Sequence, residues 1–227
     1  MSSENESKIS NEKLNFFGVI TAGVTHELNN VISIMNELTG LIEDQVYIAE
    51  QGNEIKTEKL VNIHDRLLKQ LNRGGHIIKT LNRFAHTADE ELLSFDLNSL
   101  ISNLVELCHR FANLKKAKIE NKFYDEPIMI INKPFELQRA VFLYIKNLLK
   151  IAGSNTVIEL TTNLTESKPL LVISGYSVLS ENIDDLPVPA IEYIIKELGG
   201  NVEIISSENQ VIITIKLPVS YNKLVDK

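Results

Sequence analysis

Three side chains in one short stretch of the chain have types and spacings that suit chemistry: His26, Glu27 and Asn30. A neutral imidazole is a nucleophile, an adjacent carboxylate can hold one ring nitrogen as N–H, and an amide can orient a water or a phosphoryl oxygen. Asn30 follows His26 by four residues, the spacing that places two side chains on the same face of a helix. This set suits phosphoryl transfer, provided that the imidazole faces solvent.

Apolar residues around His26 recur at alternating spacings of three and four, which predicts a long helix with a buried seam. The seam consists of Leu14, Phe17, Thr21, Val24, Leu28, Val31, Met35, Leu38 and Ile42. A second apolar row beside it makes the stripe wide enough for a four-helix bundle and consists of Ile20, Ile34, Leu41 and Ile48. Since His26 comes two residues after seam position Val24, we expect it on the outer face of this helix.

A second long helix is expected after a break at residues 51–53. Its seam consists of Leu60, Ile63, Leu67, Gln70, Gly74, Ile77, Leu81 and Phe84. Two such helices form a hairpin that leaves one flank of its apolar stripe uncovered. Two hairpins paired across a two-fold axis would cover that flank, so we expect a homodimer.

Beyond residue 90 the pattern changes to mixed helices and strands, which predicts a sheet with helices on one side. Helices are expected over residues 97–116, with Asp96 as N-cap, and over 134–152 and 189–198. Strands are expected over residues 128–131, 156–162, 170–174, 202–205 and 211–217. The expected fold is α + α/β: a flexible tail at 1–10, a helical hairpin at 11–90 and an α/β sandwich at 91–227.

The residues around His26 resemble the phosphoacceptor box of sensor histidine kinases, whose core is His-Glu-Leu-x-Asn. Here the core is His26-Glu27-Leu28-Asn29-Asn30, approached through a stretch with several small residues that begins at Phe17. Many members of the family have a proline where this chain has Val31, so a straighter helix is expected. The elements after residue 91 follow the order of the family's ATP-binding domain, so the resemblance covers nearly the whole chain. It implies that His26 is the phosphorylated residue, and it is closest to dimeric histidine phosphotransferases.

The same resemblance implies that the family's ATP site is degenerate here. Asn147 matches the second asparagine of the family's asparagine box, but Leu143 replaces the first. The glycine-rich lid is replaced by the short link 184–188, so backbone N–H groups to hold phosphates would be lacking. We therefore expect Asn147 to be a surface or capping residue rather than a magnesium ligand.

The family's Asp-x-Gly-x-Gly loop is also altered. Here it is Ser174-Gly175-Tyr176-Ser177-Val178. Ser174 replaces the aspartate that binds the adenine amino group, and Tyr176 and Val178 replace glycines, so their side chains are expected to fill space that the nucleotide needs. We expect neither tight ATP binding nor autophosphorylation from ATP.

The sequence therefore favours a phosphorelay protein, a histidine phosphotransferase that passes phosphoryl groups between response-regulator aspartates through His26. It would need no cofactor of its own, because Mg²⁺ would come with the partner receiver domain. The docking surface is expected around His26, with Ala22, Gly23 and Asn29 permitting close approach and the second domain supplying another contact. Two alternatives stay open: a sensor histidine kinase with an atypical ATP site, and a non-catalytic adaptor that binds response regulators. A phosphatase role, with Asn30 orienting water, is a variant of the first interpretation.

Composition and the remaining reactive residues disfavour other classes of function. The formal charge of −7 over 227 residues includes no clustered basic tract, which argues against binding nucleic acid or an anionic membrane. Cys108 is the single cysteine, and no apolar stretch is long enough to span a bilayer, so we expect a cytoplasmic protein. The other histidines have no acid-plus-amide setting and form no metal-binding pair; they are His64, His76, His86 and His109.

Overall fold

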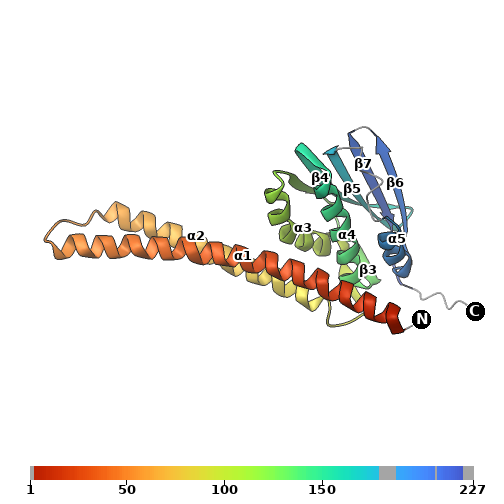
Figure 1. Ribbon diagram of the computed structural model, residues 1–227, viewed down its shortest axis with the longest axis horizontal. Helices are drawn as coiled ribbons and strands as arrows, with labels where there is room; N and C mark the ends of the chain where they lie inside the picture. Colours follow the sequence, from red (N-terminus) through yellow and green to blue (C-terminus); the bar gives the residue numbers. More distant parts are fainter. Residues whose placement is uncertain (1–2, 179–187, 208, 222–227) are drawn as a thin grey trace, which may run out of the picture. The chain divides into compact units, whose positions relative to one another are not determined.

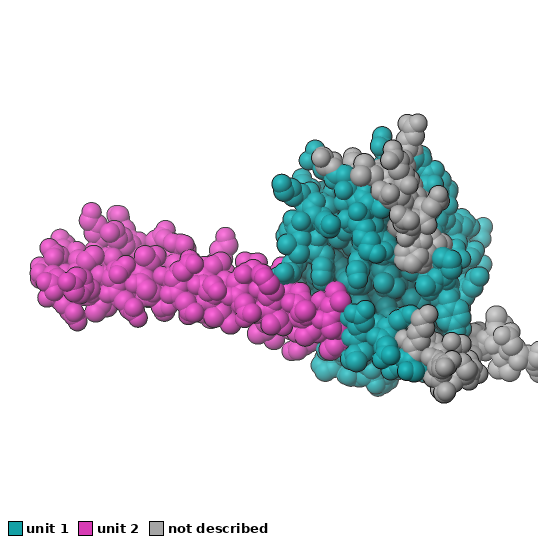
Figure 2. Space-filling model, in the orientation of Figure 1, with its two compact units in different colours: residues 1–16, 83–227 teal, residues 17–82 magenta. Residues whose placement is uncertain are grey.

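The computed structural model describes residues 3–178, 188–207 and 209–221 and divides the chain into two compact units. One unit is formed by Phe17–Asn82, and the other by Met1–Phe16 together with Arg83–Lys227 (Figure 2). The division therefore falls inside the two long helices and not at residue 90, where the change of sequence pattern predicted it. The reason is that Phe16, in the first third of α1, and Phe84, near the end of α2, both pack against Phe135 of the second unit.

The two long helices are α1 (Ser3–Glu50) and α2 (Thr57–His86), which form the predicted hairpin (Figure 1). Seam residues Val24, Val31 and Leu38 are buried, as the spacing predicts, whereas Leu14 is 70% exposed. Helix α1 ends where Gly52 takes the left-handed conformation, with φ of 77°.

The expectation of a flexible tail at residues 1–10 is corrected for residues 3–10, which form the first turns of α1. Their polar composition gives no seam, and so the sequence pattern suggested a loose segment. A helix that is already anchored at Phe16 can be extended at small cost, because each added residue gains a hydrogen bond without new nucleation.

The second unit contains a five-stranded sheet in the order β2-β4-β5-β7-β6, and β1 pairs with β3 in a separate two-stranded sheet. Only β2 and β4 are parallel neighbours in the large sheet. The elements in chain order are β1 (Leu93–Asp96), α3 (Leu97–Leu114), β2 (Lys118–Lys122), β3 (Met129–Asn132), α4 (Pro134–Lys150), β4 (Ala152–Thr165), β5 (Lys168–Val178), α5 (Val188–Glu197), β6 (Asn201–Ser207) and β7 (Gln210–Lys216).

Helices α3, α4 and α5 cover one face of the large sheet (Figure 1). Side chains along these strands alternate between the two faces of the sheet. Leu160 of β4, Ile173 of β5 and Ile213 of β7 are fully buried on the face that the helices cover, and the neighbours of each along its strand point to the other face. The predicted helices and strands of this unit are confirmed, with ends shifted by a few residues.

Strands β1 and β2 were not predicted. Strand β2 has the sequence Lys-Ile-Glu-Asn-Lys, in which Ile119 is the single buried residue. A short, charged strand at the edge of a sheet lacks the apolar alternation on which strand prediction depends.

Asp96 caps α3, as predicted, and also binds Ile128, the residue just before β3. One carboxylate oxygen accepts hydrogen bonds from the N–H groups of Asn98 and Ile128, and the other accepts from the N–H and hydroxyl of Ser99. Burial raises the pKa of Asp96, but these hydrogen bonds outweigh it, so its pKa lies below the usual value.

We expect Asp96→Ala to lower the free energy of unfolding by about 1–2 kcal/mol at pH 7, because several N–H donors lose their acceptor. A carboxylate whose pKa is lowered by folding stabilises the protein above its unfolded pKa, and this stabilisation is lost as pH falls through the folded pKa. The difference from wild type in urea unfolding should therefore shrink below about pH 4. Asp96→Asn, which retains the capping oxygen, should cost less at pH 7; an equal loss in both variants would contradict the capping role.

Candidate functional site

His26 lies exposed on α1, within the helical unit, as the seam predicts. The side chain nitrogen Nδ2 of Asn30 lies 3.5 Å from the ring nitrogen Nδ1 of His26, and Asn30 is also exposed. The four-residue spacing thus places the amide beside the imidazole. The opposite ring nitrogen, Nε2, takes no part in this contact.

Glu27 has a different environment from the one expected for it. It is partly buried, and among the described contacts of the His26 ring the amide of Asn30, not the carboxylate of Glu27, is within hydrogen-bond distance. Consecutive residues on a helix point about 100° apart, so Glu27 does not face the ring. In this structure Asn30 is the residue placed to orient the imidazole.

His26 borders an open, mostly apolar hollow of about 560 Å³ on the helical unit. We call this hollow the His26 groove; it is lined by Phe17, Gly18, Thr21, Ala22, Thr25, His26 and Asn29. Most of these residues precede the histidine by one or two helical turns on the same face. Their spacing of three to four residues from one another could have identified the groove from sequence.

Two of the three residues expected to permit close approach, Ala22 and Asn29, line this groove. Gly23 does not, because it is buried on the inner side of α1. Gly18 takes its place, and a Cβ added to Gly18 would meet no atom within 4 Å. The surface beside His26 is therefore made of small side chains, but not the full set that was predicted.

Helix α1 continues without interruption through Val31, the position where the resemblance led us to expect a straighter helix than in proline-containing relatives. Val31 is buried, and a Cβ added to Gly74 of α2 would lie 3.4 Å from its Cγ1 atom. Gly74 thus allows close packing of the two helices at this level.

The remaining histidines are exposed, and no group of three or more metal-ligating side chains occurs in the described part of the chain. His64 lies 3.3 Å from Asp65, and His86 lies 2.7 Å from Asp89. Neither has an amide one turn further along the helix, so neither repeats the arrangement of His26 and Asn30.

The asparagine in α4 is buried, which corrects the expectation of a surface or capping side chain. Asn147 is 4% exposed and its Nδ2 has no hydrogen-bond partner among the described residues, while Leu143, one turn earlier, is partly buried. Tyr144 is also buried on this helix; burial and the nearby charge of Glu192 on α5 raise the pKa of its hydroxyl. The apolar residues around Asn147 could have predicted its burial from the sequence. The expectation of a surface position came instead from comparison with the family's ligand position.

The altered loop of the sequence forms the end of β5. Ser174 and Tyr176 alternate with the fully buried Ile173, and they pair with Glu159 and Val157 on the sheet face away from the helices. Tyr176 is 38% exposed, so it does not fill a space beneath the helices; Gly175 occupies the helix-facing position instead. The side chain of Val178 and the 179–187 part of the replaced lid lie outside the described residues.

Two acceptors that the resemblance implies for an adenine nucleotide are missing from the described residues. No acidic residue occurs along β5 to accept the adenine amino group, and the helix-facing position near its end is Gly175. The buried Asn147 has no acidic or amide partner at the position of Leu143. We therefore derive no chemical step through ATP.

Comparison with known proteins identifies relatives of one kind. Sensor histidine kinase ZraS of Escherichia coli (strain K12) is 24% identical over 229 residues, which cover 93% of this chain and 48% of the relative. The corresponding protein of Escherichia coli O157:H7 is 23% identical over the same length. The chain is similar to sensor histidine kinases. It spans about half the length of these curated relatives, and no family model matches it.

Solved structures show the same fold. The catalytic domain of histidine kinase ThkA superposes with a TM-score of 0.51 at 17% identity, covering 58% of this chain and 97% of that domain. Histidine kinase ThkA in complex with response regulator protein TrrA gives a TM-score of 0.50 at 18% identity, covering 95% of this chain and 66% of that chain. The α/β unit thus has the fold of a histidine kinase catalytic domain. None of the described helices is long and apolar enough to cross a membrane.

Proposed function

We propose that this chain carries phosphoryl groups between receiver domains of response regulators, through His26 and without ATP. The observation on which this depends is the pairing of an exposed His26 with Asn30 beside an open groove. The absence of an acidic residue along β5 supports transfer without ATP. The similarity to sensor histidine kinases supports the two-component assignment, and the solved complex of ThkA with a response regulator supports a receiver as partner.

The chemistry follows from the orientation of the imidazole. The side chain oxygen and nitrogen of an amide are interchangeable by rotation, so Asn30 can accept a hydrogen bond from Nδ1–H of His26 and leave Nε2 as the nucleophile. The Nε2 lone pair attacks phosphorus, an N–P bond forms, and the P–O bond to the receiver aspartate breaks to release a carboxylate. The reverse reaction loads a second receiver. Mg²⁺ comes with the receiver.

The His26 groove supplies the docking surface in this proposal. Its lining is apolar and made largely of small side chains, such as Gly18 and Ala22, so a partner helix can approach α1 closely. In this proposal the α/β unit supplies a second contact with the receiver.

The proposal includes a homodimer. The exposed apolar residues of α2 recur at heptad-related spacing along one flank and are Val61, Leu68, Leu71 and Ile78. They adjoin the inner seam that packs against α1, so each α2 has apolar surface for two neighbours, as in a four-helix bundle. Exposed apolar residues of α1, including Ile32 and Leu41, enlarge this surface.

The test is to mix the full chain with a panel of receiver domains charged with radioactive acetyl phosphate and Mg²⁺, and to follow acid-labile phosphate. We expect label on this chain from at least one receiver, and transfer onward to a second. A parallel reaction with γ-labelled ATP should leave the chain unlabelled. Label from ATP would favour an atypical kinase, and binding to a receiver without label would favour an adaptor.

The role of the groove can be tested by adding one methyl group. Gly18→Ala places a Cβ where no atom lies within 4 Å, so the variant should fold and be more stable by about 0.5–1 kcal/mol. If a receiver packs into the groove, its affinity should fall by about three- to tenfold, because the methyl group occupies the contact surface.

Gly40→Ala is the matched control. Gly40 lies on the same helix, is equally open around an added Cβ, and is not part of the groove. It should gain similar stability in thermal unfolding and leave receiver affinity unchanged, as measured by calorimetry. Equal affinities for both variants and wild type would exclude the groove as docking surface.

A further inference from the structure

Two exposed asparagines follow His26 on α1 and lie on either side of it. Asn29 comes three residues after His26 and Asn30 four residues after it. With 3.6 residues per turn, Asn29 lies about 60° to one side of His26 and Asn30 about 40° to the other. A helical side chain leans toward the N-terminus, over the turn before its own Cα atom, so both amides lean toward the histidine. The contact between Asn30 and the ring agrees with this direction.

The ring edge that carries Nε2 is turned away from Asn30. Asn30 contacts Nδ1, and in an imidazole Nδ1 and Cδ2 are bonded to opposite sides of Cγ, with Nε2 bonded to Cδ2. Asn29 lines the His26 groove together with His26, whereas Asn30 does not. Asn29 is therefore the amide on the Nε2 side of the ring, where the proposed function places the phosphoryl group.

Helix α1 offers no cation to a phosphoryl group on His26. From Leu14 to Glu50 the sequence of this helix contains neither lysine nor arginine. Phosphoryl oxygens are strong hydrogen-bond acceptors and need donors. Of the side chains that lean over His26, both that can donate are neutral amides, and one of them, Asn30, is engaged with the ring.

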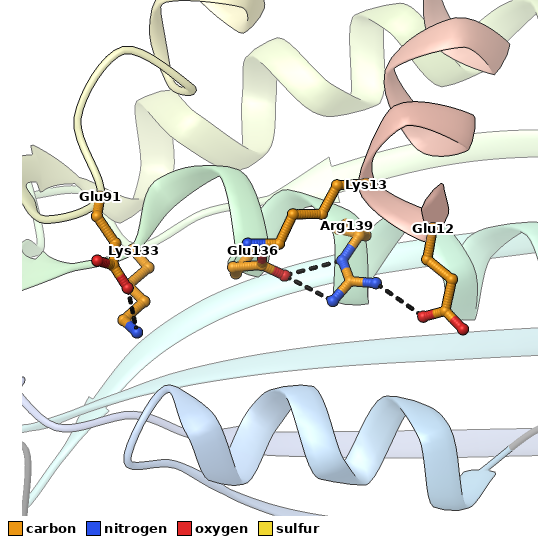
Figure 3. A network of polar contacts seen from close by, with 6 residues as sticks. All are labelled: Glu12, Lys13, Glu91, Lys133, Glu136 and Arg139. Atoms are coloured by element: carbon orange, nitrogen blue, oxygen red, sulfur yellow. Dashed lines mark hydrogen bonds and ion pairs between the residues drawn. The ribbon is translucent and has the colours of Figure 1, made fainter. Parts of the chain in front are cut away.

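The charged side chains at the start of α1 are already paired, as Figure 3 shows. Glu12 lies 3.2 Å from Arg139 of α4. Lys13 lies 2.7 Å from Glu136 of the same helix. By contrast, the amide of Asn29 makes no hydrogen bond among the described residues, so its N–H groups are available to a ligand.

We infer that Asn29 donates a hydrogen bond from Nδ2 to an oxygen of the phosphoryl group while that group is carried on Nε2 of His26. This role rests on the proposed function, which supplies the phosphoryl group. The two asparagines then act differently: Asn30 orients the ring through Nδ1, and Asn29 stabilises the group that is transferred. A neutral donor suits a carrier, because its hydrogen bond is weaker than that of a cation and lets the phosphoryl group leave for a second receiver.

The first test needs no receiver, because phosphoramidate phosphorylates histidine directly. The Nε2 lone pair forms the N–P bond, the P–N bond of phosphoramidate breaks, and ammonia leaves. The other histidines are exposed as well, so label is measured on the peptide that contains His26, by mass spectrometry at alkaline pH. The labelling reaction is run at pH 8, above the ordinary histidine pKa of about 6.5, so that ring protonation does not limit the rate.

Asn29→Ala removes the donor and should slow labelling of His26 by about three- to tenfold. Alanine has the higher helix propensity, so this loss cannot come from unfolding of α1. Asn29→Asp places a negative charge beside the incoming anion and should slow labelling by at least about tenfold.

Asn36 provides the matched control. It is exposed on α1 and follows Asn29 by seven residues, which places it on the same face but about 15 Å from His26 along the helix axis. At 0.15 M salt a charge at this distance is largely screened, since the Debye length is about 8 Å. Asn36→Ala and Asn36→Asp should therefore leave the labelling rate within about twofold of wild type.

The second test uses a phosphorylated receiver. Asn29→Ala should lower kcat about three- to tenfold and leave KM within about twofold, because the lost contact is to the transferred group and not to the receiver surface. A higher KM with constant kcat would assign Asn29 to receiver docking and would overturn the inferred contact. Labelling by phosphoramidate at the wild-type rate in Asn29→Ala, or equal slowing in the Asn36 variants, would overturn it as well.

The inferred contact and the proposed function can fail separately. If no receiver charges wild type, but Asn29→Ala still slows chemical labelling of His26, the proposed function fails and the contact with the phosphoryl group stands. If receivers charge wild type and all Asn29 variants are labelled at the wild-type rate, the proposed function stands and the contact fails.

Discussion

His26→Gln is expected to lower the rate of phosphoryl uptake from a charged receiver by at least about a thousandfold, because glutamine retains size and polarity but has no nucleophilic ring nitrogen. The side chain is exposed on α1, so the variant should fold as wild type does. The measurement is the initial rate at which acid-labile label appears on the chain. Receiver binding should change little, since most of the groove is untouched.

His64→Gln provides a matched control for this loss. His64 is also exposed on a long helix and has a carboxylate 3.3 Å away, but the residue four positions on is Leu68. Uptake should stay within about twofold of wild type, because His64 lacks the neighbouring amide and the groove. If the His64 variant loses uptake while the His26 variant retains it, the phosphorylated residue has been assigned wrongly.

Leu68→Glu combined with Leu71→Glu is expected to convert the proposed homodimer into a monomer at micromolar concentrations. Both leucines are about half exposed in the single chain, at 47% and 55%, and lie on the free flank of α2. Burial of a leucine side chain contributes up to about 1.5–3 kcal/mol, and each substitution acts twice in a symmetric dimer. The dissociation constant should rise by at least about a thousandfold, as measured by sedimentation equilibrium.

The control is a second double variant, in which two exposed apolar residues outside α2 are replaced by glutamate. Leu114 and Ile205 are 69% and 64% exposed and belong to the α/β unit, not to α2. Their replacement by glutamate should leave the mass of the assembly unchanged. A monomeric wild type, or a Leu68 and Leu71 variant that stays dimeric, would exclude this flank as the dimer interface.

The local part of the candidate site could be predicted from sequence because it depends on one helix. Four-residue spacing places Asn30 beside His26, and the seam places His26 outside, whatever else the chain does. The N-cap at Asp96 is local in the same sense, since its main acceptor contacts lie within three residues. Glu27 was misplaced because adjacency in sequence was given more weight than the 100° turn between neighbours.

Features that depend on pairing between distant segments could not be predicted in the same way. The sheet face on which Ser174 and Tyr176 lie could not be predicted from their order in the sequence: alternation with the buried Ile173 places both on the face away from the helices. A one-residue change of register reverses the side of a sheet that every side chain faces, and only packing against the helices sets that register.

The sequence by itself determined the two long helices, the exposed histidine with its amide neighbour, and the order of elements in the α/β unit, because helix and strand periodicities are properties of short segments. The tertiary structure alone decided that α1 begins eight residues earlier than expected, that its first part belongs with α4, and that Gly18 and not Gly23 borders the groove. These outcomes depend on which apolar faces meet, as Phe16 meets Phe135 and Phe142, and no local pattern specifies the partner of a buried face.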